Sequence, residues 1–159
     1  LITLVAKDSF GNLVPFQQVT LSAPTPSIIL TGPAATDGNG VWRGTAKSAL
    51  AQTQTLTANL GAIALSRSIQ FVPGPPAAIN SSVTAGAQST VANGQSSVNL
   101  VVQLADAANN AVANQNVTLA IGGSNNMPGA LSGATDAAGQ WRTTLTSTRA
   151  ENKALVATA

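Results

Sequence analysis

Apolar and polar residues alternate along two stretches of the chain, residues 2–7 and 100–105. A period of two places successive side chains on opposite faces, so both stretches are predicted to be half-buried strands. Further short apolar runs lie between turn-favouring clusters of Gly, Asn, Asp and Pro, and no segment combines a helical period with caps. The side chains expected to face inward are Ile2, Leu4, Ala6, Leu100, Val102 and Leu104, with Val101, Gln103 and Ala105 facing outward, and additional strands are expected at residues 19–21, 56–58, 63–65, 69–71 and 119–121.

The chain also repeats itself with a period of about 98 residues. Residues 4–12 return as residues 102–110, and residues 36–43 return as residues 135–142, one position further on. A unit of this length is too long for a solenoid coil and suits a whole small β domain. Several short strands with turns about every 8–12 residues favour a Greek-key sandwich of two sheets. The chain is therefore predicted to be all-β, with tandem sandwich domains.

The repeat alignment predicts a first domain at residues 1–72, a joint at 73–76 and a second domain at 77–159. The counterparts of residues 79–98 would precede the first repeat, and the second repeat has no counterpart of residues 63–71. We therefore expect the first domain to lack its first strand and the second its last strand, as in a window cut from a longer array. Unpaired strand edges would weaken the isolated chain and invite pairing with another chain.

The joint is predicted to be short and semi-rigid. It contains three prolines, Pro73, Pro75 and Pro76, which fix their own φ angles and keep the preceding residues extended. Domains joined in this way are expected to form a rod rather than a loosely tethered chain.

The composition removes most catalytic chemistry. The 159 residues include no Cys and no His, which excludes thiolate nucleophiles, Ser/His/Asp triads, disulfides and His- or Cys-based metal sites. Seven Lys and Arg and five Asp and Glu are scattered along the chain, without the basic stripe that binds nucleic acid. No apolar run approaches the roughly 18 residues of a spanning helix. We expect no enzymatic activity, no cofactor, no nucleic-acid partner and no membrane contact by this segment.

Two pairs of recurring Asp residues are expected to open turns. Gly in the first repeat is replaced by Asn in the second, and these are the residues that most readily accept a positive φ. An Asp three residues earlier commonly accepts hydrogen bonds from turn amides. The alternative is Ca²⁺ binding, but each loop offers a single carboxylate, and Ca²⁺ takes six to eight oxygens, so turn capping is favoured. The predicted turn residues are Asp8, Gly11, Asn12, Asp37, Gly40, Asp106, Asn109, Asp136 and Gly139.

A Trp-Arg pair also recurs, at Trp42 and Trp141. Alternation places Trp141 on the same face as Leu145 and its neighbouring Arg on the other face. Since Trp is highly buried on average, we expect both rings to fill cores otherwise built of Ala, Val and Leu. The alternative is a stacking platform for a sugar ring.

The order of these elements resembles the bacterial immunoglobulin-like repeats of intimin and invasin adhesins. A strand is followed by Asp-x-x-Gly-Asn-x-Val-Pro, Val-Thr-Leu, Thr-Asp-x-x-Gly and a Phe-x-Pro-Gly-Pro joint. The resemblance covers nearly the whole chain. In this sequence the elements lie at residues 8–15, 19–21, 36–40 and 71–75, and residues 92–96 resemble the run that precedes the family's second strand.

The resemblance implies immunoglobulin-like domains in the stalk of an adhesin on the bacterial cell surface. The outer-membrane anchor would lie outside this chain. The partners would be neighbouring repeats, with a host-cell or bacterial receptor bound by a distal domain that is also outside it. The alternative function is a ligand- or carbohydrate-binding module of a secreted enzyme or of a phage particle, because sandwich folds host many functions.

Overall fold

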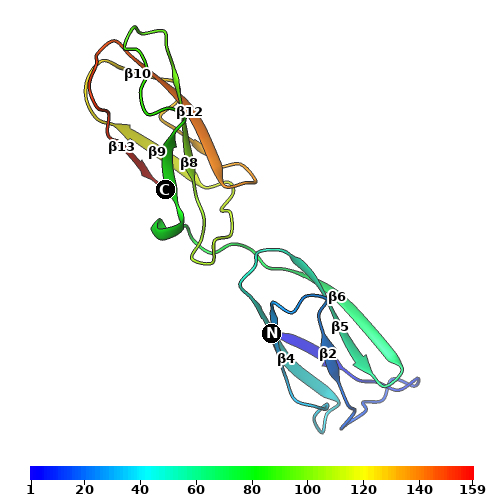
Figure 1. The fold of residues 1–159 in the computed structure, drawn as a ribbon. Coiled ribbons are helices and arrows are strands. Elements are labelled where there is room, and N and C mark those ends of the chain that lie inside the picture. The colour runs from blue at the N-terminus through cyan, green and yellow to red at the C-terminus, as the bar shows by residue number, and fades with distance from the viewer. The chain divides into compact units, whose positions relative to one another are not determined.

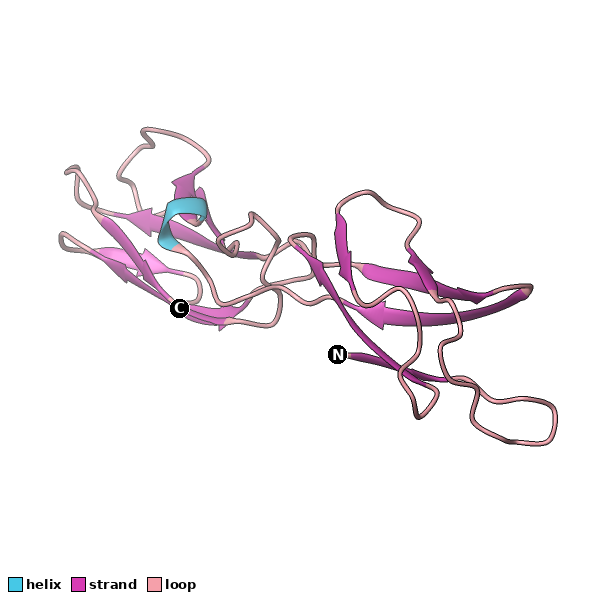
Figure 2. Cartoon of the chain, turned by 90° about the horizontal axis from the view of Figure 1, so that it is seen from below, coloured by secondary structure: helices cyan, strands magenta, loops and turns pink.

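A computed structural model describes residues 1–159 and divides them into two compact units, Leu1–Val72 (unit 1) and Pro73–Ala159 (unit 2). Each unit is built of short antiparallel strands joined by turns (Figure 1). The only helical element is a single turn of 3-10 helix, η1 (Ala78–Asn80), drawn in cyan in Figure 2. None of the chain's helical structure is long and apolar enough to cross a bilayer. The prediction of an all-β fold is confirmed.

Unit 1 contains two three-stranded sheets. One sheet has the order β1-β4-β3 and the other the order β2-β5-β6, with every neighbouring pair antiparallel. The strands are β1 (Ile2–Val5), β2 (Thr20–Ser22), β3 (Ile28–Thr31), β4 (Val41–Ser48), β5 (Thr53–Leu60) and β6 (Ile63–Gln70).

Unit 2 repeats this pairing with two strands gained, β7 and β11, and one absent. Its sheets have the orders β10-β12-β8-β7 and β11-β9-β13. The strands are β7 (Ser82–Ala85), β8 (Val98–Gln103), β9 (Asn116–Ile121), β10 (Asn126–Pro128), β11 (Ser132–Ala134), β12 (Gln140–Ser147) and β13 (Leu155–Thr158).

The repeat alignment relates the two units strand by strand. Strands β1, β2, β3, β4 and β5 of unit 1 correspond to β8, β9, β10, β12 and β13 of unit 2. The single bridge between Gln18 and Ala35 corresponds to the pairing of Asn116 with Ala134 in β9 and β11. Strand β7 has no equivalent in unit 1, and β6 has none in unit 2.

The alternation of apolar residues sets the core of each unit. Leu4 lies opposite Trp42 in the β1–β4 pair, and Val102 lies opposite Trp141 in the β8–β12 pair. The buried apolar residues that pack together as the core cluster of unit 1 are Leu4, Ala6, Val19, Trp42, Ala58 and Leu60, and those of unit 2 are Leu100, Val102, Leu104, Val112, Val117, Leu119, Trp141 and Leu145.

One outward-facing position departs from the predicted alternation. Ala105 is expected to face solvent but is buried. The chain entering β7 covers it, since the N–H of Ala77 donates to the carbonyl of Ala105 at 2.8 Å and the Ser81 hydroxyl lies at 3.3 Å from the same oxygen. This contact joins residues about 28 positions apart, so local periodicity does not reveal it.

The two strands predicted at residues 63–65 and 69–71 form one strand, β6. The intervening Ser66, Arg67 and Ser68 keep their pairing with β5, and the strand ends at Gln70. None of these three residues favours a turn strongly enough to interrupt the ladder. The hydroxyls of Ser66 and Ser68 lie within hydrogen-bond distance of Thr57 and Thr55 across the strands, at 3.0 and 3.2 Å, which supports continuous pairing.

Both Trp rings lie against glycines. Trp42 is 2% exposed, and its indole N–H donates to the carbonyl of Pro33 at 2.6 Å. A Cβ atom at Gly32 or Gly44 would overlap this ring, and a Cβ at Gly133 would overlap Trp141, which is 8% exposed. The absence of side chains at these positions gives each large ring its space in a core otherwise made of aliphatic residues.

We expect Trp141→Ala to lower the free energy of unfolding of unit 2 by about 3–5 kcal/mol, because it removes the largest side chain of that core. Arg142→Ala, the exposed neighbour, should change it by only about 0.5 kcal/mol. Denaturant unfolding followed by circular dichroism measures both values.

The Trp fluorescence of the native protein should have its emission maximum at shorter wavelength than exposed indole, without a shift on adding soluble glycans. Emission typical of indole in water would contradict the buried placement.

Candidate functional site

Four Asp side chains organise four similar turns, at Asp8, Asp37, Asp106 and Asp136. In each turn one carboxylate oxygen accepts the N–H groups of the residues two and four positions further on, at 2.8–2.9 Å. The N–H three positions further on donates to the Asp carbonyl, at 2.9–3.1 Å. Each carboxylate therefore satisfies main-chain donors that the strands leave unpaired.

The fourth residue of each turn has a left-handed backbone. The φ angles are 87° at Gly11, 68° at Gly40, 65° at Asn109 and 73° at Gly139. Gly139 is constrained twice, because a Cβ atom there would also overlap the carbonyl oxygen of Leu104. This close approach allows the N–H of Leu104 to donate to the carbonyl of Gly139 at 2.8 Å.

The same hydrogen bonds keep the four carboxylates charged. The Asn110 side chain, the Asn110 N–H and the Gly74 N–H lower the pKa of Asp106 to about 2. The side chain and N–H of Asn12 lower the pKa of Asp8. The N–H groups of Val41 and Gln140 do the same for the pKa values of Asp37 and Asp136.

The geometry of these turns suits capping rather than cation binding. In each turn two amide N–H groups point at one carboxylate oxygen, which leaves at most the other oxygen of a single carboxylate for a cation, whereas Ca²⁺ takes six to eight oxygen ligands. No group of three or more Asp or Glu side chains lies together. Arg43 and Arg142 lie near Asp37 and Asp136 at 3.9 and 3.3 Å, in exposed ion pairs that contribute little to stability.

The Trp residues weighed as sugar platforms lie in the cores and present no ring face to solvent. The sequence interpretation overlooked Thr36 and Thr135, the residues directly before Asp37 and Asp136. Thr36 and Thr135 are both 2% exposed, and each hydroxyl serves two main-chain groups. Thr135 donates to the carbonyl of Val112 at 2.7 Å and accepts the N–H of Gln115 at 3.0 Å. Thr36 does the same with Val14 and Gln17.

The recurrence of Thr-Asp in both repeats is the one sequence signal that could have pointed to this buried contact. In unit 2 the Thr135 hydroxyl connects the loop between β8 and β9 to the turn that precedes β12. In unit 1 the Thr36 hydroxyl connects the loop between β1 and β2 to the turn that precedes β4. A hydroxyl that donates and accepts in a buried position is difficult to replace, because loss of it leaves two main-chain groups unpaired.

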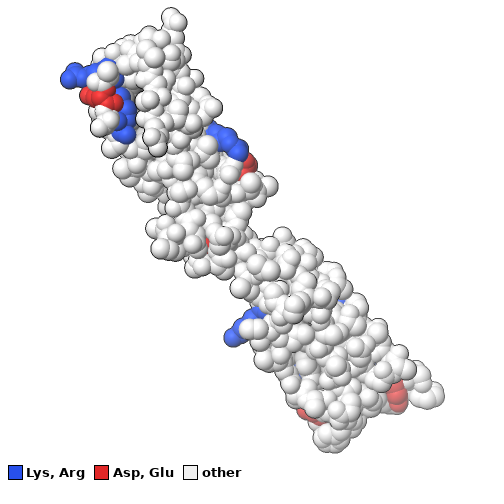
Figure 3. Space-filling model, in the orientation of Figure 1, with Lys and Arg blue, Asp and Glu red and all other residues white.

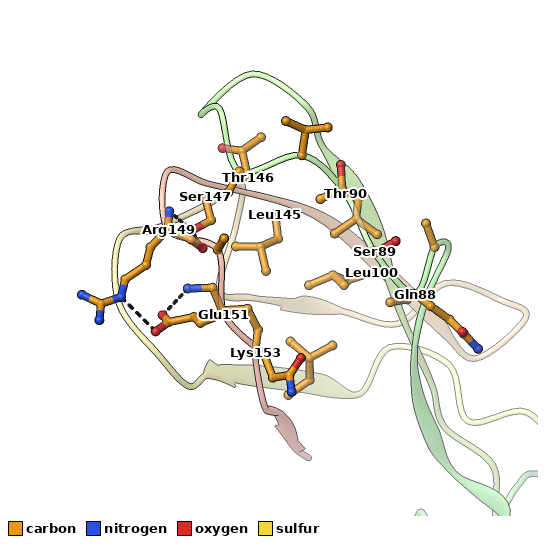
Figure 4. A pocket seen from close by; sticks show the side chains of 18 residues that line it. Gln88, Ser89, Thr90, Leu100, Leu145, Thr146, Ser147, Arg149, Glu151 and Lys153 are labelled. Atoms are coloured by element: carbon orange, nitrogen blue, oxygen red, sulfur yellow. Dashed lines mark hydrogen bonds and ion pairs between the residues drawn. The ribbon is translucent and has the colours of Figure 1, made fainter.

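Unit 2 also contains a cavity of about 680 Å³, lined by residues 85–92 and 149–153 and by the ends of core strands. Figure 4 shows Glu151 at one side of it, between Arg149 and Lys153. Its carboxylate lies 2.6 Å from Nζ of Lys153 and 3.2 Å from Nε of Arg149, and it accepts the N–H of Ser124. The Lys153 and Ser124 hydrogen bonds lower the pKa of Glu151 to about 2. The carboxylate offsets one of the two positive charges, and Glu151 and Lys153 both hold Ser124 in its loop.

The rest of the surface carries few charges. The face drawn in Figure 3 is mostly uncharged, with a few Lys, Arg, Asp and Glu side chains, some of them gathered at the upper left of the view. On the outer face of β5 and β6 the polar groups are Thr and Ser hydroxyls rather than charged side chains. Such a surface stays hydrated without producing a strong long-range field.

Comparison with known families adds the decisive observation. A family model described as the bacterial Ig-like domain (group 1) matches residues 80–159, which is half of the chain. The chain belongs to this family. The matched residues lie in unit 2, and unit 1 shows the same strand pairing in its equivalent strands. No curated protein matches the sequence significantly.

Two solved structures, those of InvD and invasin, agree with this bacterial Ig-like assignment at the level of the fold. InvD of Yersinia pseudotuberculosis is 18% identical, with a TM-score of 0.67 over 98% of this chain and 46% of its own. Invasin, described as a bacterial integrin-binding protein, is 22% identical, with a TM-score of 0.52 over 98% of this chain and 31% of its own. The D0-D1 domain of intimin is 23% identical, with a TM-score of 0.43 over 98% of this chain and 79% of its own. The chain thus spans less than half the length of InvD and invasin.

We expect Thr135→Val to lower the free energy of unfolding of unit 2 by about 1–3 kcal/mol, because the Val112 carbonyl and the Gln115 N–H lose their buried partner. The matched control is Thr144→Val on the exposed face of β12, where Val suits a strand and the change should be close to zero. Urea denaturation of the two variants tests this. Equal stabilities would show that the hydroxyl contributes nothing.

We expect Asp106 to titrate near pH 2 in the folded protein, well below its ordinary value of 3.8. Because the folded-state pKa is the lower one, the charged carboxylate stabilises the fold at pH values above about 4, and this contribution is lost as the pH falls towards 2. Carboxyl carbon shifts measured by NMR give the midpoint. Asp106→Asn should lower the melting temperature at pH 7 and reduce its drop between pH 4 and 2. A midpoint near 4 would contradict the turn geometry.

Proposed function

We propose that the two units are spacer repeats in the stalk of a bacterial cell-surface adhesin of the intimin and invasin type. The observation that carries the proposal is the repetition of one bacterial Ig-like unit, with the same two Asp turns and the same strand pairing in each unit. A repeated unit in which carboxylates, Trp rings and buried hydroxyls are all used internally is suited to extending a chain rather than to chemistry.

The same contacts support a non-enzymatic role. Every Asp side chain is engaged by main-chain amides, and Glu151 is engaged by Lys153, Arg149 and Ser124. A general base or a nucleophile needs a group that is both activated and accessible to substrate, whereas these carboxylates have lowered pKa values and accept hydrogen bonds from the main chain.

The proposed function also places the repeats at the bacterial cell surface. The repeats would lie outside the cell, attached through an outer-membrane anchor in another part of the protein, with neighbouring repeats as their partners. Residues 73–76, at the start of unit 2, would act as the joint between repeats. Binding to a receptor on a host cell or another bacterium would belong to a distal domain.

The test replaces residues 1–159 in the parent protein with unrelated Ig-like spacers of equal number. Adhesion of bacteria carrying the replacement should match that of the wild type, because a spacer contributes length. Deleting the repeats should reduce adhesion wherever reach is limiting, and an antibody against residues 1–159 should label intact cells. Purified residues 1–159 should not bind target cells. If they bind, or if the replacement abolishes adhesion, the repeats themselves are adhesive and the spacer role is wrong.

A further inference from the structure

We propose that unit 1 associates with a second copy of this chain through the outer edge of β3, with the two β3 strands antiparallel about a two-fold axis at Ile29. The inference concerns an interaction between two chains. It goes beyond the spacer role and does not depend on it.

Strand β3 lies at the edge of its sheet because of the topology of the fold. It pairs with β4 on one side, and no strand lies on its other side. A strand at the place of β7 would pair with β1, at the opposite edge of the sheet, and β6 belongs to the other sheet. The equivalent strand of unit 2, β10, is also an edge, although β7 is present there.

The main-chain groups of Ile28 and Leu30 point away from β4. The N–H of Ile28 donates to the carbonyl of Thr25 in the preceding turn, at 3.5 Å. Because pairs in an antiparallel ladder alternate between hydrogen-bonded and non-hydrogen-bonded, Ile29 then bonds to β4, and Leu30 faces outward like Ile28. The same alternation holds in unit 2, where the N–H of Gly129 donates to β12 at 2.9 Å. The edge of β3 therefore offers main-chain donors and acceptors to another strand.

Unit 2 has a proline at the equivalent edge. The equivalents of Ile29 and Leu30 in β10 are Met127 and Pro128. Pro128 has no N–H to offer on the outer side, and a proline is one of the means by which proteins prevent pairing at an edge. Strand β3 contains neither a proline nor a charged residue. Of these two equivalent edges, that of unit 1 is the one able to extend its sheet.

The side chain at the centre of this edge is apolar and exposed. Ile29 is 63% exposed on the outer face of the sheet, whereas Ile28 beside it is buried. A two-fold axis at Ile29 places this side chain opposite its copy in a non-hydrogen-bonded pair, in which side chains lie closest. Each Leu30 N–H then donates to the Ile28 carbonyl of the copy. Pairing thus covers the exposed side chain and satisfies main-chain groups at the same time.

The symmetry of this edge favours a second copy over a different partner. Ile28 and Leu30 lie at equal distances from Ile29 along the strand, so the edge matches itself when turned about the axis. Lys47, opposite Ile29 on β4, is the nearest charged residue in the ladder. The two copies of Lys47 would be three strand spacings apart, about 14 Å, which exceeds the Debye length of about 8 Å at physiological salt. Their repulsion therefore does not prevent pairing.

The test is disulfide trapping in the full chain, which has no Cys of its own. Ile29→Cys places two thiols opposite each other across the axis, within the reach of a disulfide. Thr31→Cys is the control on the same face of the same strand, where the two thiols would be separated by about 13 Å along the strands, which is too far. Met127→Cys is the control at the equivalent position of unit 2. In a glutathione redox buffer, we expect Ile29→Cys to form covalent dimers about tenfold faster than either control, or more, because pairing raises the effective thiol concentration.

Leu30→Pro, added to Ile29→Cys, removes the outward N–H and should slow dimer formation to the rate of the controls. Pro128 occupies this place in unit 2, so the backbone accepts the change. In the wild type, hydrogen exchange of the Leu30 amide should slow as the protein concentration rises, and exchange at Met127 should not change. Equal trapping rates at positions 29 and 127 would overturn the proposal. So would faster trapping at position 31 than at 29, or Leu30 exchange that does not depend on concentration.

Discussion

The fold depends on supplying acceptors and donors to the main chain where strands give way to turns. In each unit one residue at the end of a core strand is the centre of this arrangement. The N–H of Ala6 donates to the carbonyl of Gly40 at 2.9 Å, and its carbonyl accepts the N–H of Val14 at 3.0 Å. Leu104 makes the same two contacts with Gly139 and Val112. These bonds form only if the Asp turns on either side hold their shape, so the carboxylates fix the register of the sheets.

The size of each core is limited by the amino-acid composition. Aromatic residues make up 3% of the chain, so each unit relies on one Trp for a large part of its buried apolar area. A ring of that size fits between the sheets only where a glycine lies against it, as Gly44 does on the same strand as Trp42 and Gly133 does beside Trp141. The composition that leaves few chemical groups on the surface thus also dictates where glycines must stand inside.

The sequence could predict what depends on local pattern and on repetition. Alternation at 2–7 and 100–105 gave the inward faces, and the exchange of Gly11 for Asn109 pointed to a left-handed turn residue, as the φ angles of 87° and 65° now show. It could not predict contacts made between distant segments. The burial of Ala105, the Gly74 bond to Asp106 and the hydroxyl of Thr135 all depend on chain entering from more than 20 residues away. No local period encodes these contacts.

The backbone conformation of Phe16 shows that contacts between distant segments can outweigh the local conformational preference of a residue. Its φ is 57°, and the equivalent residue of unit 2, Asn114, has a φ of 56°. Asn accepts this backbone readily, whereas for a Phe it costs roughly 1–2 kcal/mol, and the exposed ring gains little from packing. Both residues donate their N–H to the carbonyl of the buried Thr, at 3.2 and 2.9 Å. The loop keeps its path in unit 1 because the Thr36 hydrogen bonds require it, so the main-chain network prevails over the preference of the residue that occupies it.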